Sequence, residues 1–277
     1  MPANQMLGHL APAPSSVGVI ADTPPPPERG KLLTNRAVGQ LSTNQVRSII
    51  LDLGASGFVT PRFAITLLRF SYETADPFGV SIRASALLVF PQGVTEPFPL
   101  VGLQHDTAAL KNIAPSQSSQ SSARNVGIAF ATLGYVAVVS DCLGLGDSPG
   151  YQTHSHARSE ATCVVDALRA ARTLCVSNQV ALNGQLFLYG YSQGGHVTMS
   201  THRELETFHT NEFTVTASAP SAGAYDLGGV TVEGILSNPS YPNPWYFPIL
   251  LLAFSKSRSL GLLNALSVVS VFDSTRL

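Results

Sequence analysis

Charged side chains are scarce in this sequence of 277 residues. Only 12% of the residues are Asp, Glu, Lys or Arg, whereas soluble domains average about 25%. The 17 acidic and 16 basic residues nearly cancel, leaving a net charge of −1 without a basic stripe. Because nucleic-acid binding depends on clustered positive charge, the composition argues against a nucleic-acid partner.

Cysteine is also rare, with three residues in the chain. Cys163 and Cys175 fall in one predicted helix, roughly 18 Å apart along its axis, which is too far for a disulfide. A disulfide framework is therefore excluded. His154 and His156 could suggest a metal site, but no carboxylate or cysteine set completes it, so loop packing is the better interpretation. We expect neither a metal nor a cofactor.

Long hydrophobic runs are absent, which excludes a membrane-spanning helix. The most apolar segment, residues 245–254, has about half the length needed to cross a bilayer. Residues 1–30 lack a basic region followed by an apolar core, so no signal peptide is visible. Four consecutive prolines at 24–27 favour an extended conformation. We expect residues 1–35 to form a flexible, proline-rich segment.

Apolar residues, by contrast, make up 44% of the chain, and their periodicity predicts an α/β domain. Strands are expected at residues 66–72, 81–90, 98–104, 135–140, 185–189 and 213–219, and helices at residues 121–133, 157–174 and 193–208. The alternation of strands and helices is typical of a mainly parallel sheet with helices on both faces. We assign residues 36–227 to this core and residues 228–277 to a cap or lid.

The strongest functional motif follows the predicted strand at 185–189. It reads Gly190-Tyr-Ser192-Gln-Gly194, and a predicted helix comes directly after it. A G-x-S-x-G pattern between a strand and a helix is typical of a nucleophile elbow, a strained turn that lifts the serine hydroxyl above the sheet. We therefore predict Ser192 as a nucleophile. A serine that only capped a helix would not need glycine at both flanking positions.

Two backbone amides are candidates for an oxyanion hole. Gln193 follows the predicted nucleophile at a helix start, where its N–H can donate to a developing oxyanion. The second donor is expected in the loop after the third strand, where we predict the N–H of Asp106. Alternatively, His105 and Asp106 only close this loop through local hydrogen bonds.

A base for Ser192 is harder to find in the sequence. The acid and the histidine of such a site normally follow the serine. Only His196, His202 and His209 do so, and no histidine occurs between residues 210 and 277. The elbow should direct the Ser192 hydroxyl away from the following helix, which argues against His196 as the base. Acid candidates exist by chain order alone, namely Asp226 and Asp273, whereas Asp141 is expected to pair with nearby backbone groups.

Several blocks of sequence resemble the secretory lipase family of the lipase A type, α/β hydrolases of fungi and bacteria. They are residues 72–76 with 84–85, 104–107 with 114–116, 140–150, 166–171 and 189–196. The resemblance implies an α/β-hydrolase fold, ester hydrolysis on acyl substrates, Ser192 as nucleophile, Asp106 and Gln193 at the oxyanion, and a cap. Members of the family place the triad aspartate and histidine beyond the cap, and this sequence has no histidine after residue 209, so we expect it to lack both triad residues. The six predicted strands compare with eight in the usual α/β-hydrolase sheet.

The leading hypothesis is a serine carboxylic-ester hydrolase, a lipase or esterase that forms an acyl-enzyme on Ser192 from an ester or acylglycerol. The alternative is a non-catalytic module of the same fold that binds a lipid or small ligand in an apolar pocket under the cap. A peptidase or acyltransferase also stays open, because an elbow alone does not specify the substrate. The family is usually exported, which favours a secreted or periplasmic protein, although the missing signal peptide leaves the cytoplasm open. The sequence leaves the oligomeric state open.

Overall fold

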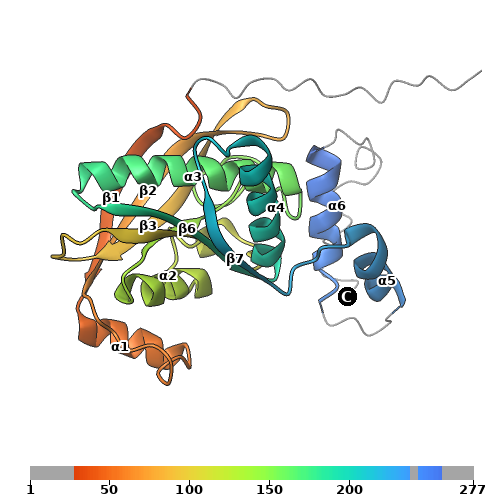
Figure 1. Ribbon diagram of the computed structural model, residues 1–277. Helices are drawn as coiled ribbons and strands as arrows, with labels where there is room; N and C mark the ends of the chain where they lie inside the picture. The colour runs from red at the N-terminus through yellow and green to blue at the C-terminus, as the bar shows by residue number, and fades with distance from the viewer. Residues whose placement is uncertain (1–27, 238–242, 258–277) are drawn as a thin grey trace, which may run out of the picture.

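A seven-stranded sheet forms the centre of the computed structural model, which describes residues 28–237 and 243–257 (Figure 1). The strands are β1 (Leu32–Leu41), β2 (Ile65–Ala75), β3 (Ser81–Pro91), β4 (Phe98–Gln104), β5 (Val136–Ser140), β6 (Leu182–Tyr191) and β7 (Val215–Ser221). Their order across the sheet is β1-β2-β3-β5-β4-β6-β7. Strands β5, β4, β6 and β7 run parallel, whereas β1, β2, β3 and β5 pair antiparallel. The parallel half of the sheet brings the carboxyl ends of β4 and β6 side by side.

Helices cover both faces of the sheet (Figure 1). They are α1 (Thr43–Asp52), α2 (Ser122–Thr132), α3 (Ala157–Ser177) and α4 (Gln193–Phe208). Helices α5 (Val232–Ser237) and α6 (Tyr246–Ser257) lie to one side of the sheet, and short turns occur at η1 (Lys111–Ile113) and η2 (Leu227–Thr231). One buried cluster joins the sheet to α3 and α4, and a second joins it to α1 and α2. Neighbouring residues of β3, such as Leu87 and Leu88, belong to different clusters. A strand covered on both faces therefore reads as a continuous apolar run.

The predicted α/β architecture is confirmed, but the strand count of six was wrong. Strand β1 begins at Leu32, within the predicted flexible segment 1–35, and pairs antiparallel with β2. It is an edge strand, and most of its residues are exposed, so it has no alternating apolar pattern to reveal it. Residues 1–27 lie outside the described residues.

Strand β7 starts two residues later than expected, at Val215. The segment predicted as a strand began at Phe213, but that residue is buried just before β7, with the Arg172 guanidinium 3.9 Å from its ring centroid. Phe213 thus contributes to the core through a loop, which apolar periodicity alone does not distinguish from a strand.

Helices α5 and α6 lie in the segment predicted as a cap, residues 228–277. The structure describes this segment up to Ser257, without residues 238–242. Helix α6 packs on the loop before α3, where the Phe254 ring lies 6.1 Å from that of His156. Several large apolar side chains of this region are exposed: Val230, Leu236, Trp245 and Leu251. In the part of the chain that the structure describes, no helix is long and apolar enough to cross a membrane.

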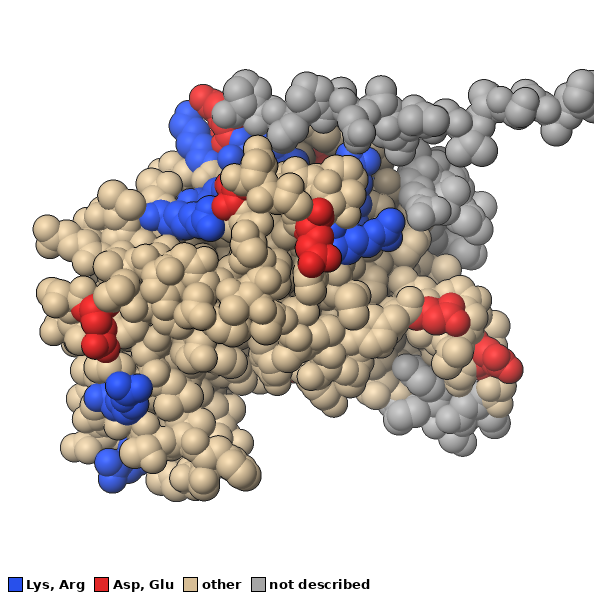
Figure 2. Space-filling model, viewed as in Figure 1, with Lys and Arg blue, Asp and Glu red and all other residues tan. Residues whose placement is uncertain are grey.

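The surface carries few charges, as the composition requires. On the face shown in Figure 2, Lys, Arg, Asp and Glu side chains form separate small groups with uncharged surface between them. This face offers no continuous basic stripe of the kind that binds a phosphate backbone.

Candidate active site

Ser192 occupies a sharp turn between β6 and α4. Its backbone has φ 57° and ψ −120°, a conformation that residues with a Cβ rarely adopt. Hydrogen bonds hold the turn: the Ser192 N–H donates to the Ser221 carbonyl over 2.9 Å, and its own carbonyl accepts from the N–H groups of Gly195 and His196. Strand β7 and the first turn of α4 therefore fix this strained residue from both sides.

The flanking glycines permit close backbone contacts. A Cβ on Gly190 would lie 2.2 Å from the Gly194 carbonyl oxygen, and one on Gly194 would lie 2.1 Å from the Gln104 carbonyl oxygen. Both distances are far below van der Waals contact, so any side chain at either position would displace the backbone. The contact at Gly194 also presses the end of β4 against the start of α4.

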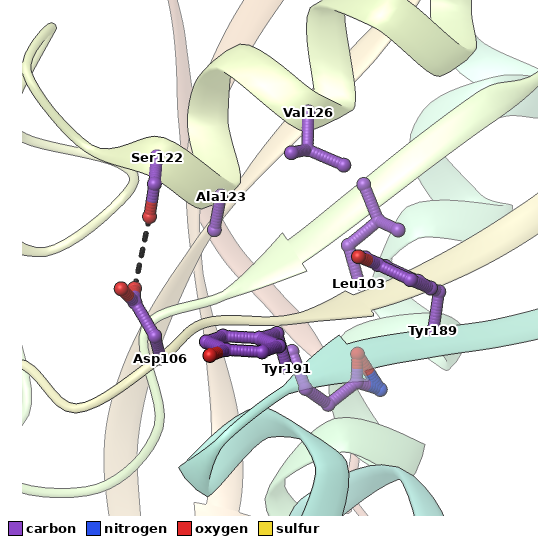
Figure 3. Close-up of a pocket in the computed structure, with 8 residues that line it drawn as sticks. Leu103, Asp106, Ser122, Ala123, Val126, Tyr189 and Tyr191 are labelled. Carbon is purple, nitrogen blue, oxygen red and sulfur yellow. Dashed lines mark hydrogen bonds between the residues drawn. The ribbon is translucent and has the colours of Figure 1, made fainter. Parts of the chain in front are cut away.

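This contact places the loop after β4 beside the elbow. Among the described residues, neither the Asp106 nor the Gln193 backbone N–H donates a hydrogen bond. The Asp106 carboxylate is turned to Ser122, whose hydroxyl donates to it over 2.9 Å at the start of α2 (Figure 3). His105 closes the loop, with its ring nitrogens facing the Asp106 and Asp141 carbonyl oxygens. His105 thus closes the loop through its ring, and the Asp106 N–H takes no part in that closure.

A hollow of about 330 Å³ lies beside the elbow, between α2 and the ends of β4 and β6 (Figure 3). Its lining is mainly apolar and aromatic, with three polar groups, and consists of Leu103, Gln104, Asp106, Ser122, Ala123, Val126, Tyr189 and Tyr191. None of these residues belongs to α5 or α6, so this hollow is not the pocket expected under the cap.

No described histidine is hydrogen-bonded to the Ser192 hydroxyl. The His196 Nδ1 atom lies 3.4 Å from a Glu160 carboxylate oxygen instead. His202 contacts Ser218 and Glu206 through its two ring nitrogens. Both imidazoles therefore face partners other than the Ser192 hydroxyl.

The acid candidates have other roles or lie elsewhere. Asp226 accepts hydrogen bonds from the N–H groups of Gly229 and Val230 at the start of η2. Asp273 lies outside the described residues. Asp141 is fully buried and accepts from the Ser116 N–H, as expected of backbone pairing, and also from the Ser85 and Ser116 hydroxyls. Burial raises the pKa of Asp141, and the hydrogen bonds from Ser116 and Ser85 oppose that rise.

A cluster next to the elbow was missed by sequence reasoning. Glu160, in the first turn of α3, is 1% exposed and accepts a hydrogen bond of 2.7 Å from the Gln193 side-chain amide. His154 and His196 are buried in the same region. Burial lowers the pKa of His154, and the nearby Glu160 charge partly opposes this. A glutamate on an otherwise small and apolar helical face is the signal that could have revealed the cluster.

The described residues show neither a candidate metal cluster nor a disulfide. No group of three His, Cys, Asp or Glu side chains in residues 28–237 and 243–257 could hold a metal ion. His156 contacts the Ser159 hydroxyl through Nδ1, as the loop-packing interpretation requires. The three cysteines are free and buried, and burial raises the pKa of Cys163 to about 12.

Solved structures of hydrolases share this fold. The ligand-bound form of LipA, a rice cell wall degrading esterase from Xanthomonas oryzae, is 30% identical over 84% of this chain and 62% of its own, with a TM-score of 0.73. A hydrolase from Legionella pneumophila is 24% identical over 83% of this chain and 62% of its own, with a TM-score of 0.77. Candida antarctica lipase A aligns with 69% of this chain and 41% of its own at 18% identity and a TM-score of 0.49.

The chain therefore spans about three fifths of the length of the first two structures. No protein-family model matches the sequence, and neither does any curated protein sequence. The relationship rests on the three-dimensional structure together with the 30% identity to the esterase.

Proposed function

Because the chain shares the α/β-hydrolase fold of a solved esterase to which it is 30% identical, we propose that it is a serine carboxylic-ester hydrolase acting through Ser192. The observation that carries the proposal is the strained turn at Ser192, with φ 57° and ψ −120°, between a parallel strand and a helix. Such strain persists only where the surrounding structure enforces it, and it clusters at functional sites. A helix cap would not require it, and the Ser192 hydroxyl makes no capping hydrogen bond.

The proposed reaction has two steps. The Ser192 oxygen attacks the ester carbonyl carbon while its proton passes to a base, and the alcohol leaves with a proton to give the acyl-enzyme. Water then attacks the acyl-enzyme and releases the acid. The N–H groups of Gln193 and Asp106 stabilise the oxyanion of each step, at about 3 kcal/mol per donor.

The base is the missing component of this proposal. None of the described histidines is hydrogen-bonded to Ser192, and residues 210–277 contain no histidine. We infer that neither Asp226 nor a histidine of the described residues completes a triad with Ser192. Turnover should then fall by about 10⁴ to 10⁶-fold from that of an intact triad. The proposed substrates are esters or acylglycerols. Export of the protein is also part of the proposal, because the Xanthomonas oryzae structure is that of a rice cell wall degrading esterase.

Covalent labelling with chemical rescue tests the proposal. The protein is incubated with a fluorophosphonate and with increasing imidazole, and the adduct is located by peptide mass spectrometry. We expect slow labelling at Ser192 that imidazole accelerates and that Ser192→Ala abolishes. A matched control, Ser218→Ala, removes a hydroxyl from the neighbouring strand β7 and should label like the wild type. A labelling rate that is changed neither by imidazole nor by Ser192→Ala would refute a nucleophilic Ser192.

A non-catalytic binding module is the second candidate, and the hollow beside the elbow favours it. A mostly apolar hollow of about 330 Å³ with a few polar groups suits a small ligand. Titration with a fluorescent fatty acid distinguishes the two. Saturable binding that Val126→Trp removes, together with no fluorophosphonate adduct, would favour the binding module.

A further inference from the structure

The carboxylate of Glu160 is buried at the junction of three segments. It projects from the first turn of α3, and one of its oxygens accepts hydrogen bonds from the Gln193 side-chain amide at 2.7 Å and from the Ser155 N–H at 3.1 Å. The other oxygen lies 3.4 Å from the His196 Nδ1 atom. Glu160 therefore links α3, the loop before it and the first turn of α4.

Both segments that Glu160 holds contain a strained residue. Ser155 and Ser192 each have a φ of 57°, in the left-handed region that favours glycine. Glu160 accepts from the N–H of Ser155 itself and from the side chain of the residue that follows Ser192. Strained residues persist only where their surroundings over-determine them, and one carboxylate contributes to that constraint at both positions.

Burial makes these contacts strong. A carboxylate that is 1% exposed has lost its water, so each remaining donor matters more than it would at the surface. The contact of 2.7 Å with the Gln193 side-chain amide is short for an N–H···O hydrogen bond. The ionisable groups near this carboxylate include His196 on α4, His154 on the loop before α3, and Cys142.

We propose that Glu160 is a positioning residue of the nucleophile elbow, acting through the side chain of Gln193. By tethering that side chain, it sets the direction of the Gln193 backbone N–H, the amide assigned above to the oxyanion. This inference deepens the proposed function and rests on it, because the effect on chemistry presupposes a nucleophilic Ser192. Glu160 itself does not touch the reacting atoms.

Kinetics of fluorophosphonate labelling in the presence of imidazole test the proposal. We expect Gln193→Ala, which keeps the backbone amide but removes the tether, to lower the maximal labelling rate by about 10 to 100-fold. The probe concentration giving half the maximal rate should stay unchanged, because the binding surface is intact. Glu160→Ala should act in the same way. Glu160→Gln should recover most of the rate, because its amide oxygen can still accept from Gln193 and Ser155.

Glu206→Gln provides the matched control, since Glu206 lies on the same helix α4 with 68% of its side chain exposed. It should label at the wild-type rate. A wild-type rate in Gln193→Ala would overturn the positioning role, even if Glu160→Ala failed to fold. An equal loss in Glu160→Gln and Glu160→Ala would also overturn it, because the loss would then follow the charge and not the tether.

Hydrogen exchange separates this proposal from the proposed function. Amide exchange of the peptide covering residues 190–198 should accelerate at least tenfold in Gln193→Ala and stay at the wild-type rate in Glu206→Gln. If the wild-type protein forms no adduct, the proposed function fails, and exchange alone then decides whether Glu160 constrains the elbow. Unchanged exchange in Gln193→Ala would refute that constraint.

Discussion

The Cα atom of Gly194 packs directly on the carbonyl group of Gln104, so that a Cβ on this glycine would lie 2.1 Å from the Gln104 oxygen. The two residues are far apart in sequence, one at the end of β4 and the other in the first turn of α4. Their contact decides how closely the loop containing Asp106 approaches the amide of Gln193. The distance between the two proposed oxyanion donors thus depends on backbone packing.

Gly194→Ala should accordingly destabilise the protein. The added methyl group meets the Gln104 backbone, which cannot rotate away as a side chain could. We expect a loss of about 3 kcal/mol in the free energy of unfolding, at the upper end for overpacking. Urea denaturation measures it. Gly57→Ala is the control, because nothing lies within 4 Å of its added Cβ; a similar loss in both variants would contradict the argument.

Ser192→Gly should make the protein more stable while removing the proposed nucleophile. Glycine adopts φ 57° and ψ −120° without a steric penalty, whereas serine is strained there. After the greater flexibility of glycine in the unfolded chain is deducted, we expect a gain of about 1 kcal/mol. Thermal unfolding compares this variant with Ser192→Ala, which keeps the Cβ and should gain nothing. Equal stability of the two variants would show that the turn is unstrained.

Acidification should destabilise the fold through His154. Burial lowers the pKa of this histidine below the usual value of 6.5, so the unfolded chain binds a proton more readily than the folded protein. Stability is therefore greatest above pH 6.5 and decreases as the pH falls from 6.5 through the lower, folded-state pKa. Melting temperatures recorded from pH 8 to pH 5 check this. In His154→Gln the melting temperature should depend less on pH in that range. If the dependence is unchanged, another group is responsible for the effect.

The buried carboxylate of Asp166 should be a major support of the N-terminal part of the fold. Its side chain is 0% exposed and accepts from Thr74 and Arg169 as well as from Arg29, at 2.7 Å, just before β1. Asp166→Asn leaves the Arg29 guanidinium without its counter-ion, whereas Arg169 keeps its ion pair with Glu212. We expect a cost of about 3 kcal/mol in the free energy of unfolding.

The exposed pair of Lys31 and Glu28 supplies the comparison for Asp166. Glu28→Gln breaks an ion pair in the same N-terminal stretch, but both partners are in water, so no measurable change is expected. Denaturant titration of the two variants side by side distinguishes a buried from an exposed pair. Comparable losses in both would contradict the role given to burial.

Apolar runs identified the buried strands of this protein but not its first one. Residues 98–104 and 135–140 were predicted as strands because both of their faces are covered, which leaves a continuous hydrophobic signal. Strand β1 was missed because most of its residues are exposed, which leaves neither a continuous nor an alternating apolar pattern. Phe213 was assigned to a strand because it is apolar, but it is buried in the loop before β7.

Local patterns determined the α/β class and the sharp turn at Ser192, because propensity, periodicity and the G-x-S-x-G spacing act over a few neighbouring residues. The tertiary structure alone decided which groups meet at that turn. The carbonyl of Gln104 reaches Gly194 across two neighbouring parallel strands, and Glu160 reaches Gln193 from another helix. Such contacts depend on strand order and helix packing, which bring together residues that no local signal connects.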